Sequence, residues 1–142
     1  MTVASPFGDV ITAQDIIATM QSLKGWEDRY RQVIQWGKKL PEFKEEDKLA
    51  DILVSGCESQ VWLFSEKKGD TWYFHADSDA RIVRGLIAIA LAAFNKKTSL
   101  EIEHFDIESY FNQIGLLEHL SSSRGNGLKA IVEEIQKVVS VG

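Results

Sequence analysis

Residues 60–94 read QVWLFSEKKGDTWYFHADSDARIVRGLIAIALAAF, and this stretch decides the fold class. Two runs rich in aromatic and branched residues, 60–64 and 71–76, flank the turn signal KKGD, which predicts an antiparallel hairpin. Residues 80–94 are apolar on nearly every side after Arg84, which predicts a helix at the buried centre of the fold. The branched run 52–54 predicts a further short strand. Together these segments predict a small three-stranded antiparallel sheet flanked by helices, an α+β fold.

Helices are predicted on both sides of this stretch. Thr12 is placed to cap a first helix that ends before Gly25, and apolar spacing predicts a second from Trp26 to about Lys39. Downstream, three more helices are predicted over residues 98–104, 107–114 and 124–139. Residues 1–10 contain Pro6 and Gly8 and predict a loose N-terminal arm. We interpret residues 1–142 as a single domain, since the length suits one core.

Charge and hydropathy exclude several classes of function. The net charge of −5 argues against nucleic acid as a partner, because phosphate binding needs a basic face. Residues 1–8 lack the basic start and apolar run of a signal peptide, and the longest apolar run, 85–94, is too short to span a bilayer. We therefore expect a cytoplasmic protein that has no membrane partner and lives in a reducing compartment.

Cys57 is the only cysteine in the chain, and it lies between two predicted strands in the sequence GCESQ. A single cysteine excludes an internal disulfide and cannot by itself hold an iron–sulfur cluster. Loops between strands often carry functional groups, and a thiol there can react as the thiolate. A free cysteine can equally be a small buried apolar residue. Position alone leaves both interpretations open.

Two further features are candidates for a supporting role. Asp77, Ser78 and Asp79 precede the central helix, where they suit helix capping; alternatively, one aspartate steers a partner or holds the Cys57 loop. Arg124 is predicted in the first turn of the last helix, where a cation is unfavourable. This cost suggests a partner such as Asp79 or a thiolate, although a plain surface arginine is the simpler interpretation.

The histidines do not form a metal-binding pattern. His75, His104 and His119 are scattered along the chain and have no ligand spacing with Cys57. His75 lies in a predicted strand and could serve Cys57 as a base in a Cys–His hydrolase. This hydrolase is one candidate function for the cysteine.

Four segments of the sequence resemble motifs of the SufE/CsdE family of sulfur acceptor proteins, and they occur in the same order and with similar spacing. They are SGCESQVW at 55–62, WEDRY at 26–30 leading to GKKLP at 37–41, DSDARIVRGL at 77–86, and SSSRGNGL at 121–128. Within the family, PFG at 6–8 and RIVRGL at 81–86 resemble the CsdE branch, whereas Ser59 and Gln60 are more similar to the SufE branch.

The resemblance implies a function. Cys57 would accept sulfur from the persulfide of a CsdA- or SufS-like cysteine desulfurase, stimulate that enzyme, and pass the sulfur to a downstream acceptor protein for iron–sulfur cluster assembly or another pathway. The chain itself would not be an enzyme and would hold no cofactor, since the pyridoxal phosphate belongs to the desulfurase. The family fold is α+β and similar to the IscU-like scaffold proteins of cluster assembly. By the same resemblance, Glu58, Ser59 and Gln60 form the moving part of the cysteine loop, and Asp79 and Arg124 support it.

Overall fold

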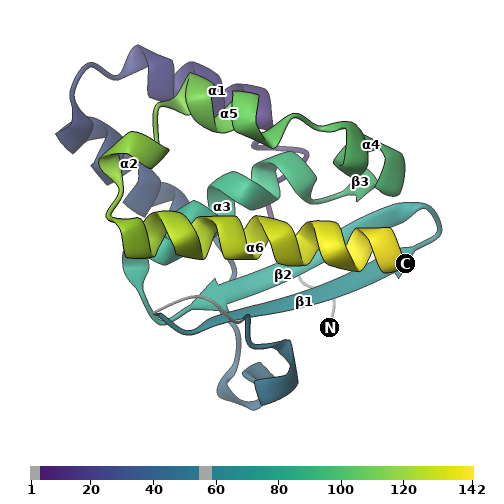
Figure 1. Cartoon of the computed structure of the whole chain (residues 1–142). Coiled ribbons are helices and arrows are strands. Elements are labelled where there is room, and N and C mark those ends of the chain that lie inside the picture. Colours follow the sequence, from purple (N-terminus) through teal and green to yellow (C-terminus); the bar gives the residue numbers. More distant parts are fainter. Residues whose placement is uncertain (1–3, 55–58) are drawn as a thin grey trace.

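The computed structural model describes residues 4–54 and 59–142. Within these residues, the fold combines six α-helices with a three-stranded antiparallel sheet (Figure 1), which confirms the predicted α+β class. The helices are α1 Ala13–Ser22, α2 Trp26–Lys38, α3 Arg81–Phe94, α4 Ser99–His104, α5 Ile107–Ile114 and α6 Ser122–Val141. The strands are β1 Val61–Lys68, β2 Thr71–Ser78 and β3 Lys97–Thr98. Three short 3₁₀ turns are η1 Glu45–Asp47, η2 Ala50–Ile52 and η3 Leu117–His119.

The sheet is built on the predicted hairpin but takes its third strand from a different segment. β1 and β2 pair along their whole length, and Gly69 in the turn has a φ of +62°, which glycine adopts without strain. The third strand is β3, on the far edge of β2. The prediction of a strand over residues 52–54 is wrong, because Ile52 is the last residue of η2 and only Leu53 makes a bridge, to Trp62.

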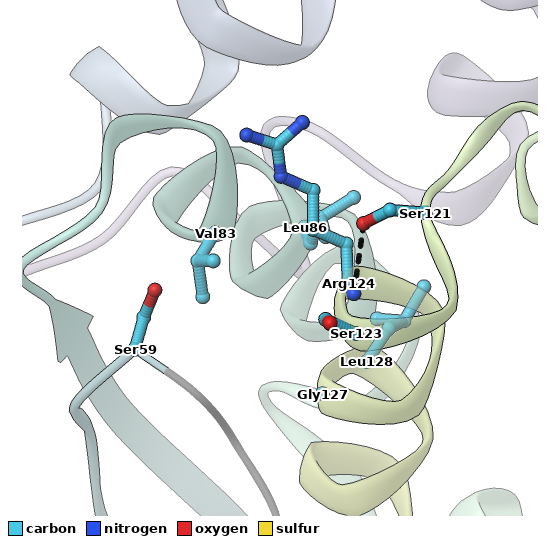
Figure 2. Close-up of a pocket in the computed structure, with 8 residues that line it drawn as sticks. All are labelled: Ser59, Val83, Leu86, Ser121, Ser123, Arg124, Gly127 and Leu128. Carbon is cyan, nitrogen blue, oxygen red and sulfur yellow. Dashed lines mark hydrogen bonds between the residues drawn. The ribbon is translucent and has the colours of Figure 1, made fainter.

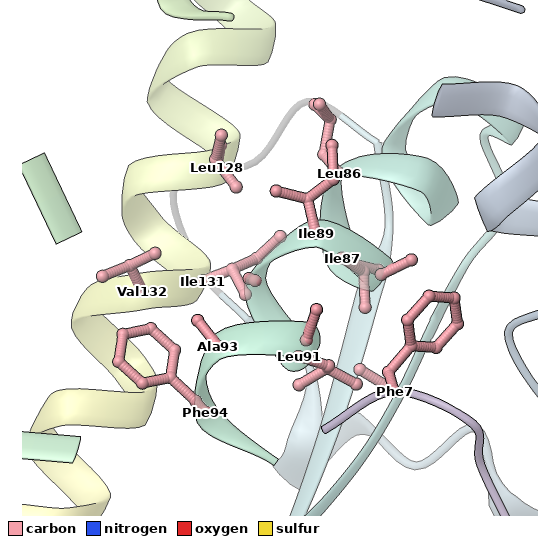
Figure 3. Packing of buried hydrophobic residues seen from close by; sticks show 14 of the residues in the cluster. Phe7, Leu86, Ile87, Ile89, Leu91, Ala93, Phe94, Leu128, Ile131 and Val132 are labelled. Atoms are coloured by element: carbon pink, nitrogen blue, oxygen red, sulfur yellow. The ribbon is translucent and has the colours of Figure 1, made fainter. Parts of the chain in front are cut away.

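α3 is the buried centre of the fold, as its sequence predicts. Every residue from Gly85 to Phe94 is buried. Figure 3 shows the side chains of α3 packing on one side against Leu128, Ile131 and Val132 of α6, with Phe7 on the other side. This helix therefore holds both α6 and the start of the chain in place.

The N-terminal segment is packed rather than loose over its described part. Phe7 is fully buried, and Asn95 Nδ2 donates a hydrogen bond of 3.0 Å to its carbonyl oxygen. Lys97 Nζ donates to the Gly8 carbonyl at 2.7 Å, and Lys96 Nζ donates to the Ser5 carbonyl at 2.6 Å. The prediction of a loose arm is therefore wrong from Ser5 onward, because one aromatic side chain fills a gap beside α3 and the backbone around it is hydrogen-bonded.

α2 and α3 pack with their backbones in direct contact. A Cβ atom added to Gly85 would lie 2.2 Å from the Val33 carbonyl oxygen, and one added to Gly37 would lie 2.7 Å from the Gly85 nitrogen. Only glycine permits this approach. The close contact brings the C-terminal end of α2 beside the first turns of α3, next to the end of β2.

Candidate functional site

A cavity of about 380 Å³ opens beside Ser59, between α3 and the first turns of α6 (Figure 2). Its lining combines apolar and hydroxyl side chains: Ser59, Val83, Leu86, Ser121, Ser123, Arg124, Gly127 and Leu128. The predicted site residues Cys57 and Glu58 lie outside the described residues. The structure brings Ser59 and Arg124, two of the predicted site residues, to the same cavity.

The chain is anchored on both sides of residues 55–58. On the upstream side, the Val54 amide donates to the Val61 carbonyl at 2.8 Å. On the downstream side, the Gln60 amide donates to Asp79 Oδ1 at 3.1 Å, and Ser78 Oγ donates to the Gln60 carbonyl at 2.7 Å. These contacts tie the segment that follows the cysteine to the end of β2.

Asp79 therefore holds Gln60 and does not cap α3. The N-cap of α3 is Ala80, and no side chain makes the capping hydrogen bond. The prediction that residues 77–79 act as helix caps is wrong for α3, because the end of β2 uses these polar groups for tertiary contacts. The alternative interpretation, in which an aspartate holds the loop that contains Cys57, agrees with the Asp79–Gln60 hydrogen bond.

Asp77 is the buried centre of a polar network that the sequence did not reveal. It forms an ion pair with Arg84, and its Oδ2 accepts a hydrogen bond of 2.9 Å from the Phe43 amide. Arg84 Nη2 also donates to the carbonyls of Gly37 and Leu40, at 3.1 and 2.6 Å. An arginine inside an otherwise apolar helix was the available signal for this network. The pair joins the end of α2, residue 43 and the end of β2 beside the site.

Replacing Asp77 with asparagine should lower the free energy of unfolding by about 3 kcal/mol, because the largely buried Arg84 guanidinium would lose its counter-charge. Chemical denaturation measures this loss. Asp79→Asn is the matched control, since Asp79 is exposed and asparagine retains an acceptor for the Gln60 amide; its effect should stay within about 0.5 kcal/mol. Equal losses in the two variants would contradict a structural role for the buried pair.

Arg124 lies at the start of α6, as predicted, but does not pair with Asp79. Its backbone amide donates to Ser121 Oγ, the N-cap, at 3.3 Å. Its side chain is exposed and makes no ion pair with any residue in 4–54 or 59–142. The suggested Asp79–Arg124 ion pair is therefore wrong, since the Asp79 carboxylate accepts its hydrogen bond from the Gln60 amide.

His75 lies on the other face of the sheet from the cavity. Its neighbours Phe74 and Ala76 belong to the core cluster, and side chains alternate between faces along a strand. The His75 ring stacks on Phe43 with 4.1 Å between the ring centroids. Burial lowers the pKa of His75 below its ordinary value of 6.5, partly opposed by the charge of Asp77. Burial and the stacking on Phe43 therefore favour the neutral form of the ring.

The described part of the chain lacks a cluster of metal-binding side chains and a helix fit to span a membrane. Residues 4–54 and 59–142 contain no group of three or more histidine, cysteine, aspartate or glutamate side chains that could hold a metal ion. Across the same residues, none of the helices combines the length and apolar character that crossing a membrane requires.

Comparisons with known proteins agree with this architecture. Residues 14–139 match the model of the SufE family, described as "Fe-S metabolism associated domain". The chain is 47% identical over 130 residues to an uncharacterized SufE-like protein of Rhizobium etli, covering 89% of this chain and 88% of that protein. It is 40% identical over 131 residues to the sulfur acceptor protein CsdE of Escherichia coli, covering 92% and 89%.

A solved structure supports the fold alone. The solution structure of a hypothetical protein from Thermus thermophilus aligns with a TM-score of 0.74 at 16% identity, covering 98% of this chain and 97% of that one. The match of the family model over most of the chain, together with the two relatives above, shows that the chain belongs to the SufE family.

Proposed function

We propose that this protein is a sulfur acceptor that takes persulfide sulfur from a cysteine desulfurase onto Cys57. The observation that carries the proposal is the similarity over most of the chain to a relative named a sulfur acceptor protein, in a sequence with one cysteine. If the chain holds sulfur on a thiol, that thiol must be Cys57.

The transfer is a thiol exchange in which atoms and electrons balance. The Cys57 thiolate attacks the outer sulfur of the desulfurase persulfide and forms a new S–S bond. The S–S bond of the donor breaks, and the donor cysteine leaves as a thiolate that can take up a proton. No oxidant or reductant is consumed. Pyridoxal phosphate would generate the persulfide on the desulfurase and would not bind this chain.

The cavity beside Ser59 supports this role. Cys57 precedes Ser59 by two residues in the sequence, so in this proposal the thiol would rest against the apolar wall formed by Val83, Leu86 and Leu128. A thiol against apolar groups is held in its neutral, less nucleophilic form. Attack would then follow docking of the desulfurase, which would limit reaction with other thiols and disulfides.

The supporting residues fit the same scheme. Ser59 borders the cavity and Gln60 is hydrogen-bonded to Asp79, so this contact would set where the loop containing Cys57 and Glu58 rejoins the sheet. Arg124 would lie on the side that meets the partner. The protein would stimulate the desulfurase by accepting its sulfur, and a downstream acceptor would receive that sulfur for cluster assembly or another pathway.

The alternative of a Cys–His hydrolase has less support, because His75 is stacked on Phe43 on the face of the sheet opposite to the cavity. A base must come within hydrogen-bond reach of its nucleophile. The position of His75 therefore favours the carrier.

Intact-mass measurement after incubation with a cysteine desulfurase and free cysteine tests the proposal. The protein should gain one sulfur atom, located on Cys57 by peptide mapping and removed by a reducing agent. His75→Phe should gain the same sulfur, because phenylalanine preserves the stacking on Phe43. An acyl adduct on Cys57 with an ester substrate, lost in His75→Phe, would instead favour the hydrolase.

A further inference from the structure

A groove of about 500 Å³ lies between α2, the start of α3 and the first turn of α6. The described residues that line it include four cationic side chains and no carboxylate: Arg31, Lys38, Arg81 and Arg124. Tyr30, Ile34 and Ile82 add apolar and aromatic surface. Since the whole chain carries a net charge of −5, this groove is a basic surface on an acidic protein.

Three of the four cations have no counter-charge within the described chain. Lys38, Arg81 and Arg124 are exposed and form no ion pair with residues 4–54 or 59–142. Arg31 does pair with Asp28, at 2.9 Å, but both side chains are largely in solvent. The groove is therefore left with uncompensated positive charge.

Arg81 and Arg124 occupy helix positions that do not stabilise the fold. Arg81 is the first residue of α3 and Arg124 lies in the first turn of α6, and neither first turn contains an acidic residue. The N-terminal end of a helix carries a partial positive charge, so a cation there is unfavourable. Lys38 is in the last turn of α2, where a cation is favourable, so the fold by itself accounts for this lysine.

We propose that the groove binds an acidic segment of the desulfurase, a proposal that rests on the proposed function. Carboxylates of that segment would face Lys38, Arg81 and Arg124, and an apolar side chain would pack on Ile34 and Ile82. A small free anion would leave the apolar part of the groove uncovered. Arg124 lines both this groove and the cavity beside Ser59, so a segment bound here lies next to the place where sulfur transfer is proposed.

The test compares two charge-reversal variants of the full chain in binding to a pyridoxal-phosphate-dependent cysteine desulfurase. Lys38→Glu/Arg81→Glu changes the groove, and Lys129→Glu/Lys137→Glu makes the same change in net charge on the exposed face of α6. At low salt, the groove variant should bind about tenfold more weakly than the control, because attraction at two contacts becomes repulsion. The difference should shrink as salt is raised. Circular dichroism and thermal unfolding confirm that both variants fold.

Sulfur gain on Cys57, measured at saturating protein, separates this proposal from the proposed function. The groove variant should still gain one sulfur atom at saturation, since Cys57 is intact. Equal weakening in both variants would overturn the proposal, because the attraction would then depend on overall charge. The proposal would also be overturned if the groove variant bound the desulfurase as tightly as the wild-type protein but lost binding to an oligonucleotide. The groove would then be a site for nucleic acid. If the wild-type protein gains no sulfur, the proposed function fails whatever the affinities are.

Discussion

Replacing Cys57 with serine should abolish the gain of sulfur and the stimulation of the desulfurase, while the fold and the affinity for the desulfurase stay unchanged. The reason is chemical: a serine hydroxyl is not ionised near neutral pH and cannot form the S–S bond that holds transferred sulfur. The sequence contains no second cysteine that could take over. The expected effect is therefore complete loss rather than a slower reaction.

Intact-mass spectrometry of the variant, run beside the wild-type protein with the same desulfurase and free cysteine, checks this result. Ser59→Ala is a suitable control, since it changes a residue at the edge of the cavity and keeps the thiol. It should still gain one sulfur atom. Faster sulfur release by the desulfurase in the presence of Cys57→Ser would show that stimulation does not need the acceptor thiol, and the proposed mechanism would be wrong.

Replacing Gly85 with alanine should lower the free energy of unfolding by about 3 kcal/mol or more, which is a large share of the stability of an ordinary domain. The new Cβ would lie 2.2 Å from the carbonyl oxygen and 2.8 Å from the carbonyl carbon of Val33. These are backbone atoms, so no change of side-chain conformation relieves the overlap. α2 and α3 would have to separate, which would also disturb the contacts of Arg84 with Gly37 and Leu40.

Gly125→Ala is the matched control for this variant. Gly125 is also inside a helix, α6, but nothing lies within 4 Å of an added Cβ. Alanine has the higher helix propensity, so this variant should be more stable by about 0.5–1 kcal/mol. Chemical denaturation of the two variants should therefore give changes of opposite sign. A stabilised Gly85→Ala protein would show that the two helices are not in backbone contact.

Much of the fold could be predicted because its signals are local. Thr12 caps α1 as its sequence context suggests, and both Thr12 and Thr98 form complete capping boxes. Gly115 ends α5 with a φ of +67°. The alternating runs on either side of the KKGD turn pair as predicted, although β1 continues to Lys68, beyond the predicted end at Phe64. Caps, turns and apolar periodicity act over a few residues, so the sequence displays them directly.

The contacts around the candidate site depend on residues far apart in the sequence. Asp77, Ser78 and Asp79 have the composition of a helix cap, yet they bind Phe43, Arg84 and Gln60 instead. The two-residue strand β3 is too short to give a pattern, and it pairs only because the chain turns after α3 and returns along β2. The sequence places Phe7 in an irregular arm, and only the tertiary structure shows that its side chain is buried beside α3.

Cys57 as the single thiol, the class of fold and the family were evident in the sequence, because they depend on residue type, short-range periodicity and ordered motifs. The cavity beside Ser59, the basic groove that shares Arg124 with it, and the place of His75 on the opposite face of the sheet were decided by packing. Most of the side chains that line the cavity and the groove come from α2, α3 and α6, which lie far apart in the sequence. Their proximity follows from the close approach of Gly37 and Gly85 and from the packing of α6 on α3, and no local pattern encodes which helices become neighbours.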